Sequence, residues 1–220
     1  MNPAGITHHP ADELLLAHAA GRMPTGPALV LAAHLEQCAH CREQHRLVEA
    51  MGGVLLESLP EAQLAPDALT RTLQRLATPA APPPAATAGA PPPLPPGARW
   101  PRALRGCSAT RWRWIGPGMR WSRVQVPQDP QANVFLLRIG PGKYLPRHTH
   151  SALEFTQVLH GRFHDGRALF DAGDFDAADD EVLHQPVVQD GSECICLAAV
   201  EGRVVFESWI ARRLGALVGM

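Results

Sequence analysis

Histidine and cysteine side chains lie close together near the start of the chain, in a pattern suited to metal binding. The segment His34-Leu-Glu-Gln-Cys38-Ala-His-Cys41 falls within a stretch, residues 27 to about 51, that is predicted to form one long helix. At about 100° per residue, these three side chains share one face of such a helix. An imidazole and two thiolates can fill three corners of a tetrahedral zinc site. The spacing therefore predicts a zinc site that needs one more ligand.

The fourth ligand must come from another part of the chain. His8 and His9 lie just before a helix expected to begin near Pro10, and His9 is preferred because it directly precedes that proline. Two other interpretations compete with zinc binding. Cys38 and Cys41 could be ordinary buried thiols, or they could form a thioredoxin-like redox pair. The redox pair is disfavoured because no βαβ pattern flanks the two cysteines.

A second group of potential ligands lies in the C-terminal half of the chain. His148 and His150 are two residues apart, so they point to one face of a strand, and Glu154 joins them if the strand stays regular. Imidazole and carboxylate groups that converge inside a small barrel can hold Zn, Mn, Fe or Ni. The competing interpretation is that these are polar side chains exposed to solvent.

Residues 142–161, with a glycine at each end and His-x-His-x3-Glu between them, closely resemble the first cupin motif. The resemblance implies a cupin-type barrel, a double-stranded β-helix, with His184 as a fourth ligand at the position of the second motif's histidine. The second motif is less complete, because Asp179 stands where proline is common and no asparagine follows the histidine at the usual place. The bound ion would be a divalent metal, and zinc is the first expectation.

Different kinds of structure must position the two groups. Before the middle of the chain the apolar pattern is helical, as with Leu69, Leu73 and Leu76 at i, i+4 and i+7. Later segments are short and rich in β-branched or aromatic residues, with turn residues every 8–12 positions, which is typical of an all-β sandwich or barrel. Nine prolines fall between Thr78 and Gly97 and predict a semi-rigid linker. The expected organisation is a small helical zinc-binding bundle over residues 1–77, a linker over 78–98, and a β-barrel metal-binding domain over 99–220.

Composition excludes several classes of function. Lys and Arg total 20 and Asp and Glu total 21, a balance that argues against direct nucleic-acid binding and gives no reason to expect a charged membrane surface as partner. No apolar run approaches the 18 residues of a membrane span, and the first residues do not read as a secretory signal. Five cysteines, an odd number, fit a reducing cytoplasm. Basic and aromatic residues alternate over 111–123, but a β-hairpin turning at residues 116–118 explains them better than single-stranded nucleic-acid binding does.

The His-x3-Cys-x2-Cys segment with an upstream histidine resembles the zinc-associated anti-sigma domain of bacteria. With the linker and the cupin motif, almost the whole chain resembles the ChrR type of anti-sigma factor. The resemblance implies that His9, His34, Cys38 and Cys41 hold zinc and that the helices grip an extracytoplasmic-function (ECF, group IV) sigma factor. It further implies that the barrel senses a stress, notably singlet oxygen. The leucines near residues 69–76 then have two interpretations, as core or as part of the sigma-binding surface.

Two further features keep alternatives open. Cys194 and Cys196 share a strand face, and they could be small buried apolar residues or a redox-active pair. The competing function is a metal-dependent cupin enzyme, of dioxygenase or isomerase class, with an N-terminal interaction module. The barrel segment supplies no obvious further acid, base or substrate clamp, so the regulator is favoured. A metal-storage or zinc-sensing protein is a third interpretation.

Overall fold

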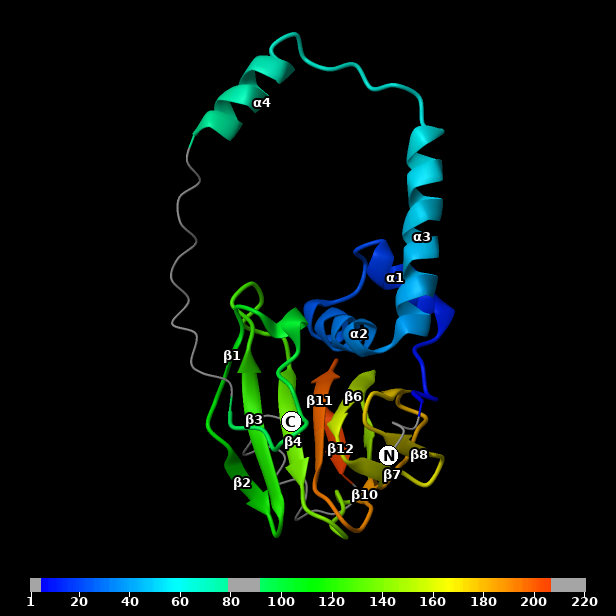
Figure 1. Ribbon diagram of the computed structural model, residues 1–220, viewed down its shortest axis with the longest axis vertical. Helices are drawn as coiled ribbons and strands as arrows, with labels where there is room; N and C mark the ends of the chain where they lie inside the picture. The colour runs from blue at the N-terminus through cyan, green and yellow to red at the C-terminus, as the bar shows by residue number, and fades with distance from the viewer. Residues whose placement is uncertain (1–4, 79–91, 207–220) are drawn as a thin grey trace.

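The computed structural model describes residues 5–78 and 92–206, which form a helical part followed by a β part (Figure 1). The helices are α1 (Asp12–Ala19), α2 (Thr25–Gln37), α3 (Ala39–Glu57), α4 (Ala68–Ala77) and the short 3₁₀ helix η1 (Arg102–Leu104). The expected order, helices followed by an antiparallel β-structure, is confirmed. Most of the predicted linker, residues 79–91, and the end of the chain, residues 207–220, lie outside the described residues.

The prediction of one long helix over residues 27–51 is wrong. The helix α2 stops before Cys38, which takes an extended conformation with φ −93° and ψ 108°, and α3 begins with the next residue. The Cys38 Sγ then caps α3 by accepting a hydrogen bond from the backbone N–H of Cys41 at 3.4 Å. Because the chain turns here, the single-face argument for His34, Cys38 and Cys41 is also wrong. The three side chains meet at a corner between two helices.

The third helix carries the chain away from the β-structure, and α4 lies beyond its far end (Figure 1). Beyond the predicted end near residue 51, α3 continues through Gly52 and Gly53 to Glu57. Its one buried residue lies in the first turn, and α4 buries none of its residues. The leucine stripe of α4 is therefore not part of a core among the described residues.

The β part consists of one large antiparallel sheet, with two smaller groups of strands packed against its inner face. The large sheet has the order β1-β3-β4-β11-β6-β9, with β2 paired to β3, and the smaller groups are β10-β7-β8 and β12-β5. The strands are β1 (Ser108–Ala109), β2 (Arg113–Gly116), β3 (Met119–Gln125), β4 (Val134–Ile139), β5 (His148–His150), β6 (Glu154–His160), β7 (Arg162–His164), β8 (Leu169–Asp171), β9 (Phe175–Ala178), β10 (Val187–Val188), β11 (Cys194–Val200) and β12 (Val204–Phe206). The predicted hairpin is confirmed, because β2 and β3 pair across residues 116–118.

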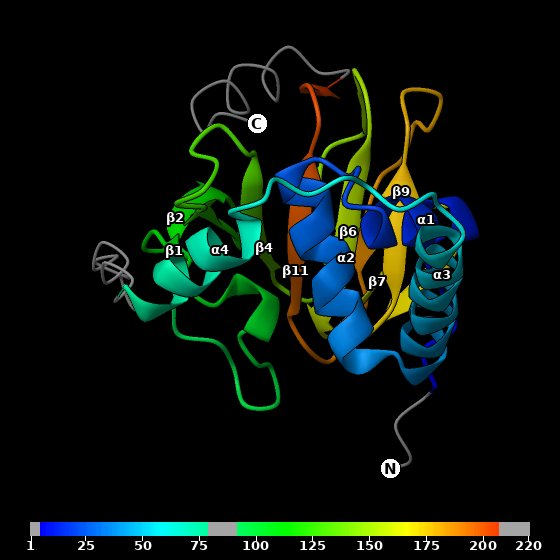
Figure 2. The same cartoon turned by 90° about the horizontal axis from the view of Figure 1, so that it is seen from above.

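The central strands of the large sheet are buried on both faces. Every residue of β11 is buried, as expected for a strand covered on both sides. Its outward residues Ile195 and Leu197 share one hydrophobic core with Val30 and Leu31 of α2. Figure 2 shows α2 lying across β11 and β6. The helical part is thus joined to the barrel by a continuous core.

A glycine allows this close approach. A Cβ on Gly26, in the first turn of α2, would come within 3.2 Å of the Val134 side chain and 3.3 Å of Ala199.

The last residues of the predicted linker are part of the described structure. Pro92 is buried, and Leu94 packs against the core that α2 shares with the sheet. The division at residues 77 and 98 stays a prediction.

The inner face of the sheet forms the barrel interior. Phe163, Phe170 and Val188 of the smaller group pack against Val158 and Cys194 of the large sheet. Side chains therefore alternate along β6 between the core shared with α2 and the barrel interior. This alternation places residues for two different environments on one strand.

Candidate metal centres

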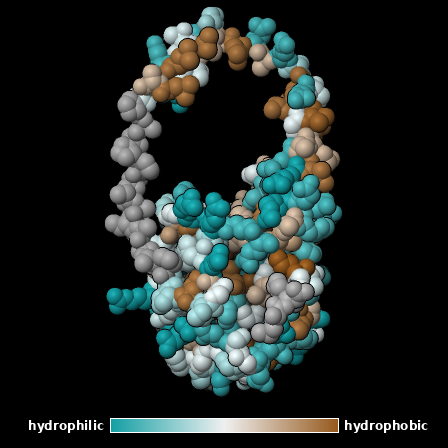
Figure 3. All heavy atoms as spheres, in the orientation of Figure 1, coloured by the Kyte–Doolittle hydropathy of each residue, from teal (hydrophilic) through white to brown (hydrophobic). Residues whose placement is uncertain are grey.

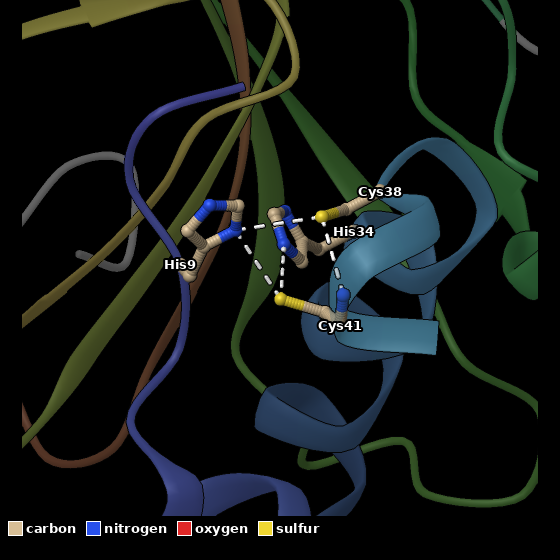
Figure 4. A group of neighbouring side chains, drawn as sticks. All are labelled: His9, His34, Cys38 and Cys41. Carbon is tan, nitrogen blue, oxygen red and sulfur yellow. Dashed lines mark hydrogen bonds between the residues drawn. The ribbon is translucent and has the colours of Figure 1, made fainter. Parts of the chain in front are cut away.

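The helical cluster brings together the four predicted side chains. His34 lies at the end of α2, Cys38 at the corner, Cys41 in the first turn of α3, and His9 in the segment that precedes α1 (Figure 4). One ligand atom from each lies within 4.8 Å of the other three. The alternative residue, His8, turns instead toward Asp174, with its Nδ1 3.1 Å from a carboxylate oxygen. The geometry thus favours His9 as the fourth member of the cluster.

The distances between these atoms match those between the ligands of one zinc ion. The His9 Nδ1 lies 3.4 Å from Cys38 Sγ and 3.3 Å from Cys41 Sγ, and the His34 Nε2 lies 3.3 Å from Cys41 Sγ. Usual Zn–N and Zn–S bonds at a tetrahedral angle give a nitrogen–sulfur separation of about 3.6 Å. The donor set and its spacing therefore fit a structural zinc ion.

The environment of the thiols also suits a cation. Burial, followed by the contact with Cys38, raises the pKa of the Cys41 thiol to about 12. A thiolate at this position therefore needs a compensating positive charge. The N-terminus of α3 supplies part of it, because Cys38 and Cys41 lie at the positive end of the helix dipole.

The barrel contains the second cluster, which is fully buried and made of His148, His150, Glu154 and His184. The strand does not stay regular from His148 to Glu154, because the chain breaks at residues 151–153. The two histidines lie on β5, paired with β12, while Glu154 begins β6, paired with β9 and β11. His184 reaches the cluster through an isolated bridge to His148.

The ligand atoms of this cluster face one another. The His148 and His184 Nε2 atoms are 3.0 Å apart, those of His150 and His184 are 3.3 Å apart, and His150 Nε2 lies 3.0 Å from a Glu154 oxygen. Two nitrogens on one metal lie about 3.0 Å apart at a right angle and about 3.4 Å apart at a tetrahedral angle. The spacing therefore fits a divalent metal and leaves its coordination number open.

The protonation of these groups is also suited to a metal. Burial lowers the pKa of His148 to about 4, and its Nδ1–H donates to the Pro146 carbonyl at 2.8 Å, which leaves Nε2 free to ligate. Burial opposes ionisation of Glu154, but its hydrogen bond to His150 and the nearby imidazoles together lower its pKa to about 2. The cluster therefore offers a neutral imidazole at His148 and a carboxylate at Glu154, the forms that metal ligation requires.

Beside the cluster lies a small cavity. Its volume is about 40 Å³, and its lining includes His148, Glu154, Cys194 and Cys196. This is room for a few molecules of water size. The two thiols are buried, with their sulfurs 3.7 Å apart. The contact with Cys194, followed by burial, raises the pKa of Cys196 well above its usual value.

Several residues around the two sites carried no usable sequence signal. Asp165 lies 3.6 Å from His184 Nδ1 and forms an ion pair with Arg167. Gln157 contacts His34 of the helical cluster, and Asp174 contacts His8, the residue before His9. Their partners are distant in sequence, so only the folded structure reveals their roles. Sequence spacing assigned no role to His18 of α1 or His45 of α3. In the structure, the His18 Nδ1 lies 2.8 Å from the His45 Nε2.

Comparison with known proteins gives consistent relatives. A family model described as the ChrR cupin-like domain matches residues 101–202. The anti-sigma-E factor ChrR of Cereibacter sphaeroides is 36% identical over 207 residues, which cover 94% of this chain and 95% of the relative. This chain belongs to the ChrR family of anti-sigma factors. A crystal structure of Rhodobacter sphaeroides SigE in complex with the anti-sigma factor ChrR matches with a TM-score of 0.71 and 34% identity, over 89% of this chain and all of that one.

Membership of the ChrR family decides between the two classes of function. The relative is a regulator, so the family favours an anti-sigma factor over a cupin enzyme. The small volume of the cavity agrees with a regulator, because pockets for organic substrates are usually several hundred Å³ in volume.

Within the described ranges, no helix has both the length and the apolar character needed to cross a bilayer.

Proposed function

We propose that this ChrR-family protein sequesters an ECF (group IV) sigma factor through its helices, acting in the cytoplasm without contacting nucleic acid itself. The observation that carries the proposal is an exposed apolar surface, here called the apolar arm, along the second half of α3, the following loop and α4 (Figure 3). It comprises Met51, Val54, Leu55, Leu56, Leu59, Leu64, Leu69, Leu73 and Leu76, which are 56% to 79% exposed.

Such a surface is unusual on a protein that works alone. Large exposed apolar surfaces mark binding sites for other proteins. The helix α4 adds a second argument, because it has ten residues, all outside a core, and isolated helices of that length are marginal in water. A partner that covers the leucine stripe would stabilise the helix. A sigma factor, the partner of the related ChrR, is such a ligand.

We infer that the two side-chain clusters hold metals with different tasks. His9, His34, Cys38 and Cys41 would bind zinc and fix the corner between α2 and α3, from which the apolar arm extends. His148, His150, Glu154 and His184 would bind a divalent metal, with zinc preferred, inside the barrel. The first metal would be structural and the second would belong to the sensor.

The sensing step is assigned to the barrel. The cavity joins a metal cluster to a pair of thiols and admits only small molecules, which suits a reactive oxygen species such as singlet oxygen. Damage or ligand entry at this site would alter the barrel, and α2 shares its core with the barrel's large sheet. A change in the barrel would thereby reach the helices and release the sigma factor.

Separate variants test this division of tasks. Substitution of His148 or Glu154 should abolish induction of the sigma factor's target genes while leaving sigma binding intact. Substitution of Cys38 by Ser should instead weaken sigma binding directly. Loss of sigma binding in the barrel variants, with the protein still folded, would contradict the assignment of sensing to the barrel.

A further inference from the structure

A glutamine of the barrel contacts the candidate zinc site of the helices. Gln157 lies on β6 and is fully buried, and its Oε1 lies 3.0 Å from the Nδ1 of His34. The carbonyl oxygen of Gly173, in the turn before β9, lies 3.0 Å from the same nitrogen. Both neighbours of this ring nitrogen therefore belong to the barrel.

These two contacts determine the protonation of the imidazole. A carbonyl oxygen and an amide oxygen only accept hydrogen bonds, so Nδ1 must carry the proton and donate to them. The orientation of the Gln157 amide is fixed as well, because its Nε2 donates to the Val158 carbonyl at 3.2 Å. His34 Nε2 is then left with a free lone pair, and it faces Cys41 Sγ at 3.3 Å.

The same turn of the barrel holds the segment that carries His9. Asp174 is fully buried, and one of its oxygens accepts hydrogen bonds from the backbone N–H groups of Thr7 at 2.7 Å and His8 at 3.0 Å. The backbone N–H of Phe175 donates to the His8 carbonyl at 3.1 Å. The residue that follows is His9, so its backbone is anchored to β9.

We propose that the barrel completes the zinc site of the helices, with Gln157 as the positioning residue that orients His34 and sets its tautomer, and with Asp174 as the anchor of the His9 segment. This inference rests on the proposed binding of zinc by His9, His34, Cys38 and Cys41. Metal-binding histidines usually donate their second N–H to a carbonyl or carboxylate, and such partners strongly affect metal affinity.

The arrangement links the two metal sites through one strand. Glu154 and Gln157 are three residues apart on β6, so one faces the barrel interior and the other faces α2. A shift of β6 at the barrel metal would move the oxygen that holds His34. Zinc retention by the helices therefore depends on the barrel.

The test measures zinc affinity of the full chain by competition with a chromophoric chelator, together with the absorption spectrum of the Co²⁺-substituted protein. Gln157→Met keeps the volume but removes the acceptor, and it should weaken zinc binding by the helical site about tenfold and shift the Co²⁺ bands. Gln157→Glu keeps an oxygen beside the His34 Nδ1, so it should restore most of the zinc affinity and most of the wild-type Co²⁺ spectrum. Gln128→Ala, in an exposed loop position of the barrel, is the matched control and should change neither.

Asp174→Asn gives an independent measurement if the Met variant does not fold. It retains the shape of the side chain and should also lower zinc affinity by loosening the His9 segment. Unchanged zinc affinity and an unchanged Co²⁺ spectrum in the folded Gln157 and Asp174 variants would overturn the inference while leaving the proposed function intact. A wild-type chain with no zinc in the helical site would instead refute the proposed zinc binding.

Discussion

The apolar arm makes a quantitative prediction about sigma binding. In α4, Leu69, Leu73 and Leu76 are 71%, 56% and 78% exposed, so truncating all three to Ala should leave folding unaffected. Each truncation removes about three methylene-sized groups, each contributing roughly 0.8 kcal/mol when fully buried. Because about two thirds of each side chain is exposed in the free protein, about two thirds of that free energy can be gained when a partner buries it. The expected loss is therefore roughly 1.6 kcal/mol for each leucine.

For the triple variant the loss amounts to about 5 kcal/mol of binding free energy, which corresponds to a dissociation constant weaker by roughly 10³-fold or more. The assay is titration of the full-length protein against its sigma factor by calorimetry or fluorescence anisotropy. Thermal unfolding of the free protein is followed in parallel and should shift by less than about 2 °C, as for exposed sites remote from a core.

The control uses a flank of the same helix that carries none of the leucines. The double variant Thr70→Ala and Gln74→Ala raises helix propensity slightly and leaves the leucines in place, so its affinity should stay within about threefold of the wild type. Wild-type affinity in the triple leucine variant would refute the assignment of α4 as a gripping surface. A large drop in the melting temperature of the free variant would show instead that the leucines belong to a core.

Three further predictions follow from the packing and the two sites. Leu31→Ala, in the core that α2 shares with the sheet, should destabilise the folded state by about 2–5 kcal/mol, measured by urea unfolding. If the helices and the barrel unfold in separate transitions, they do not share a common core. Gly161→Ala should lower the free energy of unfolding by more than a typical surface substitution, because φ is +71° and the new Cβ would clash with the Glu193 carbonyl oxygen. An unchanged melting temperature by calorimetry would contradict this description of the turn. Glu154→Gln should lower the metal content of the barrel by metal analysis and leave the four ligands of the helical site in place, with weaker zinc affinity there. A barrel metal content equal to that of the wild type would argue against Glu154 as a ligand.

Local sequence patterns predicted much of the architecture because they reflect local physics. The later segments rich in β-branched and aromatic residues form short strands, as predicted, and the turn of the β2–β3 hairpin lies where its glycines and proline indicate. The helix pattern failed at Cys38, where a cysteine rather than a conventional capping residue ends one helix and caps the next. Periodicity alone could not show this, because apolar residues continue through the break.

The candidate metal ligands illustrate the same limit. Their residue types and spacing predicted both clusters, although the geometric reasoning assumed one helix and one strand where the structure has two of each. The residues that support them were not predictable. Gln157 and Asp174 contact residues more than 120 positions away in sequence, and such contacts leave no local pattern. The apolar face of α2 was visible, but its packing partner was not.

The central claim, that this protein is an anti-sigma factor whose helices bind sigma, is tested most directly by purifying the full chain with the ECF sigma factor that it is proposed to sequester. We predict a stable complex that keeps the sigma factor from core RNA polymerase and that is lost in His34→Ala or Cys38→Ser while it persists in His148→Ala. A folded, zinc-loaded wild-type chain that does not bind this sigma factor, and does not prevent its association with core polymerase, would contradict the claim.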